Sequence, residues 1–118
     1  MIRFIHCVKR RDDVPQETFR RYWTDEAFDR LIQRMAALHG ASKVSRNLTL
    51  QVDANKRIME ERGSDEPYDG IIEYWWDSAS QLMEIYNSEE SRKLRAEMMN
   101  YQSRFVDFSA SSAFFTEG

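Results

Sequence analysis

Two segments of the chain carry apolar side chains on both faces of an extended backbone. Residues 2–9 and residues 69–76 are short, bounded by polar residues, and rich in β-branched and aromatic side chains. This composition is typical of strands in the middle of a sheet, which are buried on two sides. We therefore predict two central strands.

Two further segments have the pattern of outer strands. Residues 44–52 alternate apolar and polar side chains, which indicates a strand with one apolar and one polar face. A last strand is expected over residues 111–117. The long connection over residues 53–68 is polar, and within it residues 55–62 predict a short helix that ends at Gly63.

The first helix is predicted over residues 15–38, with Pro15 in its first turn and Gly40 just beyond its end. Its apolar residues recur at every fourth position, at Phe19, Trp23, Ala27, Leu31 and Met35. An α-helix has about 3.6 residues per turn, so a stripe with this longer period moves around the helix axis. The helix therefore either wraps around a curved sheet or kinks near residues 25–28, and we favour the kink.

Two helices are predicted between the third and fourth strands. Ser78 and Gln81 have the spacing of a capping box and indicate the start of a short helix. Residues 87–90 then indicate the end of this helix and the start of the next one. The second helix has apolar residues at helical spacing, at Leu94, Met98, Tyr101 and Phe105.

The order of elements is strand, helix, strand, strand, helix, strand. It predicts one α+β domain over residues 1–118 with a ferredoxin-like βαββαβ architecture, in which the first and third strands are central and the helices cover one face of an antiparallel sheet. The other face then exposes more large apolar side chains than a monomer tolerates. We expect a second copy to cover it, which gives a homodimer of the dimeric α+β barrel type.

The composition argues against several classes of function. The chain has 118 residues, with 17 Lys and Arg, 20 Asp and Glu and a net charge of −3, so neither nucleic acid nor an anionic membrane is expected as a partner. Apolar runs are short, and we expect neither a membrane span nor a cleaved leader. The single cysteine, Cys7, excludes an internal disulfide and favours a cytoplasmic location. With two histidines and no phosphate-binding motif, neither a metal nor another cofactor is expected.

Four segments resemble the EthD-like proteins of the dimeric α+β barrel superfamily. They read FRRYW at residues 19–23, YDGIIEYWWDS at 68–78, RFVD at 104–107 and AFFTE at 113–117. The resemblance extends over nearly the whole chain. It implies a homodimer with an apolar pocket between each sheet and its helices. It also implies breakdown or tailoring of hydrophobic organic molecules without a defined cofactor, often under an oxidoreductase label, although one fold supports many reactions.

The chain departs from that family pattern on the first helix. In the pattern, the helix tryptophan is followed four residues later by a histidine and then by Gly-Pro. Here Trp23 is followed by Ala27, and Phe28 and Asp29 take the places of the Gly-Pro pair. A family histidine with an acid/base role would therefore be absent from this chain.

Two residues are candidates for proton transfer. His6 shares a strand face with Phe4, so it could act as a general base over an apolar cavity, or it could be a core histidine bonded to a backbone group. Tyr22 on the first helix could donate from a pocket wall, or it could be part of the core. The candidates for ligand binding are Phe4, Trp23, Ala27, Phe28, Tyr74 and Trp76.

Three other reactive side chains are interpreted mainly as structural. His39 is expected at the surface, at the end of the first helix. Glu73 would be an acid/base candidate on a buried face, but we expect it to pair with Arg46 or Arg3 across the sheet. Cys7 is expected to be an inert thiol.

Three functions remain as hypotheses. The leading one is a homodimer that binds a small aromatic or alicyclic molecule and assists its turnover without a cofactor, with His6 or Tyr22 moving a proton. The second is a binding or accessory module that has lost the chemistry, as Ala27 suggests. The third is a haem-handling barrel in which His6 or His39 would be the ligand.

Overall fold

The chain contains four strands, five α-helices and one short 3₁₀ helix. The computed structural model describes all 118 residues. The strands are β1 (Ile2–Val8), β2 (Lys43–Leu48), β3 (Gly70–Trp76) and β4 (Ser112–Glu117). The helices are α1 (Gln16–Thr24), α2 (Glu26–His39), α3 (Asp53–Arg62), α4 (Leu82–Tyr86), α5 (Glu89–Gln102) and the 3₁₀ helix η1 (Phe108–Ala110).

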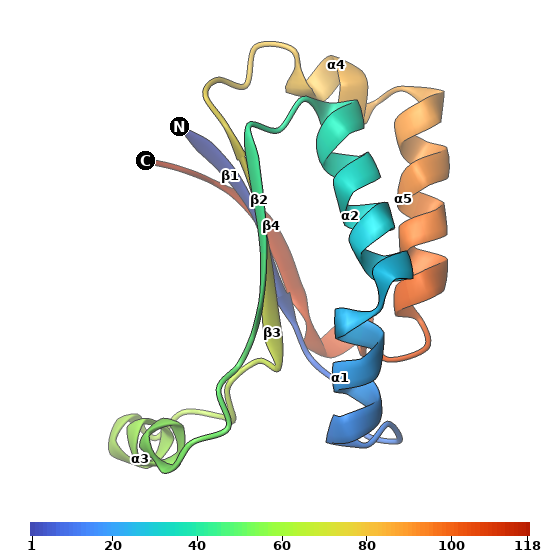
Figure 1. The fold of residues 1–118 in the computed structure, drawn as a ribbon. Coiled ribbons are helices and arrows are strands. Elements are labelled where there is room, and N and C mark those ends of the chain that lie inside the picture. Colours follow the sequence, from blue (N-terminus) through green and yellow to red (C-terminus); the bar gives the residue numbers. More distant parts are fainter.

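The strands form one antiparallel sheet in the order β2-β3-β1-β4, with β1 and β3 in the centre. In its register, His6 lies opposite Ile72 on β3 and opposite Ala113 on β4. Helices α1, α2, α4 and α5 all lie on one side of the sheet, and no helix covers its other face (Figure 1). This is the predicted α+β ferredoxin-like fold.

The predicted kink in the first helix is a complete break at Asp25. This residue has an extended backbone, with φ −67° and ψ 141°, and its side chain accepts a hydrogen bond from the Ala27 N–H at the start of α2. The break separates the two ends of the apolar stripe, so that Phe19 and Trp23 are buried from α1 and Phe28 is buried from α2. The four-residue period of the apolar stripe indicated this change in the direction of the helix axis.

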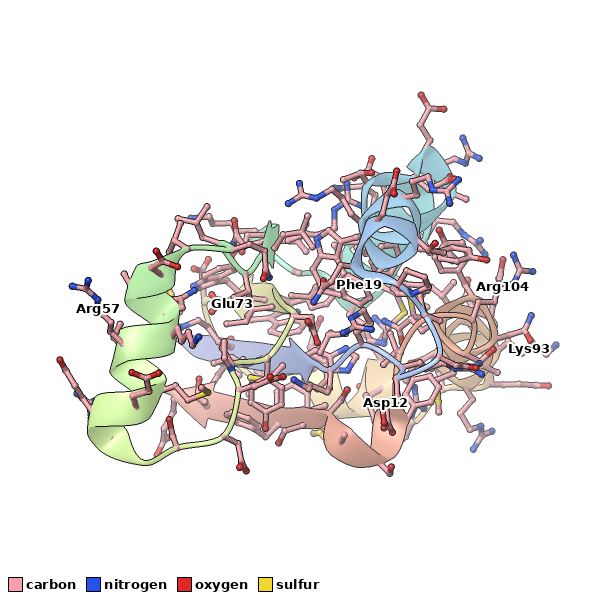
Figure 2. The ribbon with its side chains drawn as sticks, turned by 90° about the horizontal axis from the view of Figure 1, so that it is seen from below. Asp12, Phe19, Arg57, Glu73, Lys93 and Arg104 are labelled. Carbon is pink, nitrogen blue, oxygen red and sulfur yellow. The ribbon has the colours of Figure 1, made fainter.

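The core is one cluster of 16 buried residues between the sheet and the helices. Trp23 lies against the backbone of Gly70, where an added Cβ would stand 2.5 Å from the indole ring. Residue 70 therefore has to be glycine for the tryptophan to pack on the first residue of β3. Figure 2 shows Phe19 of α1 in this interior, while the charged Lys93 and Arg104 lie on the outside of the helical layer.

The second strand ends earlier than its sequence pattern predicts. Alternation continues to residue 52, but β2 ends at Leu48, and α3 begins at Asp53. Helix α3 buries none of its residues and lies beyond one end of the sheet, on the side away from α2 and α5 (Figure 1). We call residues 49–69, which contain this helix, the α3 arm.

Two predictions for the second helical region are corrected by the structure. Ser78 does not cap a helix, because α4 begins at Leu82 after an N-cap without a side-chain hydrogen bond, and the Ser78 hydroxyl bonds to Ser80. The predicted second start is confirmed: Ser88 caps α5 and accepts a hydrogen bond from the Ser91 N–H. Phe105 is buried but lies beyond the end of α5.

None of the helices combines the length and the apolar character needed to cross a bilayer.

Candidate functional site

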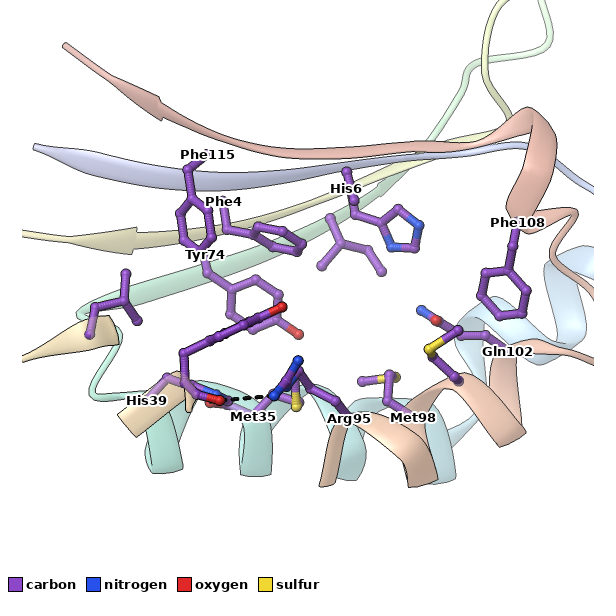
Figure 3. A pocket seen from close by; sticks show the side chains of 15 residues that line it. Phe4, His6, Met35, His39, Tyr74, Arg95, Met98, Gln102, Phe108 and Phe115 are labelled. Atoms are coloured by element: carbon purple, nitrogen blue, oxygen red, sulfur yellow. Dashed lines mark hydrogen bonds between the residues drawn. The ribbon is translucent and has the colours of Figure 1, made fainter. Parts of the chain in front are cut away.

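A cavity of about 300 Å³ lies between the helix-facing side of the sheet and helices α2, α4 and α5. Its walls are mainly apolar, and the polar exceptions come from both layers. Figure 3 shows Phe4, His6, Tyr74 and Phe115 on the sheet side and Met35, His39, Arg95, Met98 and Gln102 on the helix side. The candidate site is this cavity.

The strand register explains why the sheet wall has this composition. Side chains alternate along a strand, so Phe4 and His6 of β1 point to the same side as the residues paired with them. Phe4 is paired with Tyr74 on β3 and with Phe115 on β4, and its ring centroid lies 5.1 Å from that of Phe115. His6 is paired with the small Ala113, which leaves open space beside the imidazole. The sheet therefore presents an aromatic wall with one histidine in it.

His6 has no hydrogen-bond partner in the chain, and it lines the cavity. The alternative interpretation, a core histidine bonded to a backbone group, is therefore not supported, because the His6 ring bonds to no backbone group. Burial lowers the pKa of His6 below its usual value, because desolvation disfavours the imidazolium. At neutral pH the ring is uncharged and has a free lone pair, which is the form that a general base requires.

Other polar side chains in the cavity also lack partners, among them Gln102 and Tyr74. Gln102 on α5 is 4 % exposed, and Tyr74 on β3 is similarly buried, yet neither side chain makes a hydrogen bond within the chain. Neither is among the fully enclosed polar atoms without a partner, so their polar atoms border the cavity and are free to bond a ligand or water. Burial raises the pKa of Tyr74 above its usual range, so its hydroxyl remains a donor. Figure 3 shows Gln102 projecting towards the cavity from the helix side.

The prediction for His39 is wrong, because this residue is buried and lines the cavity. Its Nδ1 lies 2.8 Å from the Met35 carbonyl oxygen, and its Nε2 lies 2.7 Å from the Ser91 hydroxyl on α5. A carbonyl can only accept, so Nδ1 carries the proton and donates it. With both ring nitrogens used, His39 positions α2 against α5 and is not free to move a proton.

The remaining aromatic candidates lie in the core, outside the cavity. The Tyr22 ring stacks on Phe105, with centroids 5.1 Å apart, and its carbonyl accepts a hydrogen bond from Tyr101. Trp23 and Phe28 are fully buried in the same aromatic group. Trp76 is also buried, and its indole N–H donates to the His39 carbonyl, at 2.8 Å. Ala27, half-buried in the first turn of α2, does not line the cavity either.

The open face of the sheet carries the other reactive side chains. The predicted pairing of Glu73 with Arg3 is confirmed, at 3.7 Å, so Glu73 is part of an ion pair and lies on the face opposite the cavity. Arg46 instead points to the helix side and pairs with Asp29. Burial and the Glu73 carboxylate raise the pKa of the Cys7 thiol, which disfavours the reactive thiolate. Nowhere do three or more His, Cys, Asp or Glu side chains form a group that could bind a metal ion.

Comparison with known proteins agrees with this architecture. The EthD domain family matches the chain over residues 11–109. The chain belongs to the EthD domain family. The EthD match includes both helical regions and β3, and it confirms the resemblance that the FRRYW and YDGIIEYWWDS segments indicate.

Two solved structures share the EthD fold of this chain at low sequence identity. One is an ethyl tert-butyl ether d (EthD) family protein from Bacillus halodurans, with a TM-score of 0.62 and 12 % identity, over 100 % of this chain and 98 % of that one. The other is a dimeric protein of unknown function with a ferredoxin-like fold from Bacteroides fragilis, with a TM-score of 0.61 and 14 % identity, over 99 % of this chain and 95 % of that one. No curated protein matches the chain.

The sequence reasoning missed the helix wall of this EthD cavity. Ser91, Arg95, Met98 and Gln102 follow one another at steps of four, three and four residues, which is the spacing of one helix face. The apolar Met98 marked that face as buried. The polar Arg95 and Gln102 on the same face, which line the cavity, were the available signal, while Ser91 bonds to His39. The helical spacing of apolar residues alone does not identify polar side chains that share the buried face.

Proposed function

We propose that this EthD family protein binds a small, largely apolar organic molecule in the cavity and assists its turnover without a cofactor. The observation that carries this proposal is the cavity of about 300 Å³ whose apolar walls contain several polar side chains without hydrogen-bond partners, among them His6, Tyr74 and Gln102. Ligand pockets typically combine such walls with a few polar groups that orient the ligand.

The polar groups favour proton transfer next to a carbonyl or phenol group. A neutral His6 can accept a proton from the ligand, while the Tyr74 hydroxyl and the Gln102 amide can donate hydrogen bonds to its oxygen. Removal of the ligand from water would strengthen these interactions. Tyr22 lies outside the cavity, so the proton-transfer role is proposed for His6 alone.

The family resemblance also implies a class of substrate and a type of pathway. The substrate would be an aromatic or alicyclic compound in a catabolic or tailoring pathway, handled in the cytoplasm by a protein of the oxidoreductase-associated EthD type. A purely binding role is the second candidate, and it is favoured by Ala27 in the place of the family histidine. Haem handling has less support, because His39 uses both ring nitrogens and only His6 could become an axial ligand.

We also propose that the protein is a homodimer joined through the open face of the sheet. Ile5, Ile71, Trp75 and Phe114 point to this face in adjacent strands, and no helix covers them. Large exposed apolar patches usually mark interfaces. The ferredoxin-like protein from Bacteroides fragilis is dimeric, which supports the same assembly here. The α3 arm extends on the same side of the sheet, where it would meet the second copy.

A panel of small aromatic and alicyclic ketones, phenols and acids tests the proposed function. We expect some of them to raise the midpoint of thermal unfolding, because a ligand that binds only the folded state stabilises it. Any compound that is turned over should be converted far more slowly by the His6→Gln variant, which still binds it. A panel without any binder would contradict the proposal, and binding without turnover would favour the accessory role.

A further inference from the structure

We infer that the cavity selects ligands with an anionic group, such as a carboxylate or an enolate, which Arg95 binds. This inference rests on the proposed function, namely that the cavity takes a small apolar molecule. It adds the chemical class of that molecule: an organic acid whose apolar part packs against Phe4, Phe115 and Met98.

Arg95 is positioned by its neighbours before any ligand binds. Its Nη2 donates to the Tyr86 carbonyl oxygen at 2.8 Å, and its Nε donates to the Ser91 hydroxyl at 3.3 Å. The guanidinium carbon lies 3.8 Å from the centre of the Tyr86 ring, in a cation–π contact. Figure 3 shows Arg95 on the helix side of the cavity, across from His6 and Tyr74. The charge is therefore fixed in a defined place.

No carboxylate neutralises this charge. Arg95 takes part in no ion pair of the chain, and no Asp or Glu lines the cavity. The surface arginine Arg34 is different, because it forms a two-fold hydrogen-bonded pair with Glu97, at 2.9 and 3.0 Å. A half-buried cation without a counter-ion is costly, and an anionic ligand would recover part of that cost.

Arg95 also retains hydrogen-bonding capacity. A guanidinium has five N–H donors, and the bonds to Tyr86 and Ser91 use two of them. The remaining donors include both N–H groups of Nη1, and a planar guanidinium suits the two oxygens of a carboxylate. Gln102 and Tyr74 supply further donors to the same cavity. The cavity thus offers several donors and one positive charge, but no negative charge.

The other explanation is that Arg95 only connects α4 to α5 through Tyr86 and Ser91. A selectivity ratio separates the two explanations. We would measure by calorimetry the binding of 2-naphthoate and its neutral isostere 2-naphthamide at pH 7, where a carboxyl group with the usual pKa near 4 is ionised. Loss of stability weakens both compounds alike, so the ratio of their dissociation constants reports on the charge interaction alone.

We expect the wild-type protein to bind 2-naphthoate at least about 10-fold more tightly than 2-naphthamide, as for a hydrogen bond between charged groups. The ratio should fall to about one in Arg95→Met and remain partly in Arg95→Lys. The matched control is Arg92→Met, on the exposed side of the same helix and without an ion pair, which should keep the wild-type ratio.

The outcomes distinguish the inference from the proposed function. If 2-naphthamide binds as tightly as 2-naphthoate, or if Arg95→Met keeps the wild-type ratio, the inference is overturned while the binding function stands. If neither compound nor any of the panel binds, both fail. If Arg95→Met does not fold, the Arg95→Lys variant decides. A fall in the ratio of the two dissociation constants, caused by the loss of the planar guanidinium, supports the inference. An unchanged ratio, together with an equal effect of salt on the binding of both compounds, overturns it.

Discussion

His39 Nε2 lies 2.7 Å from the Ser91 hydroxyl and connects the last turn of α2 to the first turn of α5. The two residues are 52 positions apart in the sequence and are both buried beside the cavity. The same hydroxyl accepts a hydrogen bond from Arg95, and the His39 carbonyl accepts one from Trp76 on β3. One histidine therefore joins two helices and the sheet at the wall of the candidate site.

Replacement of Ser91 by alanine should destabilise the fold. The substitution leaves the buried His39 Nε2 without a partner, and we expect the free energy of unfolding to fall by about 1–3 kcal/mol. Urea unfolding checks this value. The control is Ser78→Ala, because Ser78 is exposed and bonds only to Ser80, and it should change stability by less than about 0.5 kcal/mol. Equal effects of the two substitutions would contradict the proposed role of His39.

Gly70→Ala should be destabilising because of Trp23. An added Cβ would stand 2.5 Å from the indole ring, so the strand or the ring has to move, at a cost of about 1–3 kcal/mol. The double variant Gly70→Ala with Trp23→Phe provides the control, since the smaller ring removes the clash. We expect alanine to cost less in the Trp23→Phe background. A cost independent of residue 23, measured by the same unfolding experiment, would show that the contact is unimportant.

The sheet and its order were predictable because they depend on local periodicity. Two strands with apolar residues on both faces had to be central, and β3 and β1 are central. The four-residue stripe on the first helix predicted a kink near residues 25–28, since a straight α-helix cannot bury such a stripe on one side, and the structure has a complete break there, at Asp25. The EthD resemblance added the pocket between sheet and helices, but not the residues in it.

The composition of the cavity was less predictable because it depends on contacts between distant segments. Tyr22 and Trp23 match the family motif, yet Tyr22 stacks on Phe105, which follows α5, and Trp23 packs against Phe28 of α2, so both belong to the core region. His39 has the sequence environment of a surface helix end, and only Ser91 on α5 gives it a reason to be buried. The sequence of a single strand or helix cannot show which of its buried residues border a cavity and which are packed in the core.

The charge state of His6 should depend on pH in a characteristic way. Burial lowers its pKa in the folded state below the usual value of about 6.5, so the unfolded chain binds the proton more readily. Stability should therefore be full above about pH 6.5 and fall as the pH decreases below that value, until the folded-state pKa is reached. His6→Gln should remove this part of the slope.

Nuclear magnetic resonance gives a direct measurement of the same property. The chain has two histidines, so the signal that disappears in His6→Gln identifies His6. Its titration midpoint should lie below 6.5 in the free protein. A midpoint at or above this value would mean that water or an acid stabilises the imidazolium, and His6 would then lose its advantage as a base at neutral pH.

The proposed homodimer can be tested on the open face of the sheet. Ile5 points to this face, opposite Glu73 and Phe114, so a carboxylate at residue 5 would be buried without a partner in a dimer. We expect Ile5→Glu to raise the dimer dissociation constant at least about 10-fold, measured by analytical ultracentrifugation. Met83→Glu is the matched control, because Met83 is 54 % exposed on α4, on the other side of the sheet. Its dissociation constant should equal that of the wild type.

Tyr74 and Tyr22 provide the sharpest comparison between the cavity and the core. The Tyr74 hydroxyl has no partner in the chain, so Tyr74→Phe should leave the stability of the free protein unchanged or raise it slightly. The same substitution should weaken the binding of a ketone such as 2-acetonaphthone by about 3- to 10-fold, because it removes one neutral hydrogen bond.

Tyr22→Phe should have no effect on the binding of 2-acetonaphthone, because the Tyr22 ring stacks on Phe105 outside the cavity. Calorimetry with both variants and one ligand separates the two tyrosines. Weaker binding in Tyr22→Phe alone would place the ligand among the core aromatics near α1, as the family motif first indicated. Weaker binding in Tyr74→Phe alone would place it in the cavity, because Tyr74 lines the cavity and its hydroxyl has no partner in the chain.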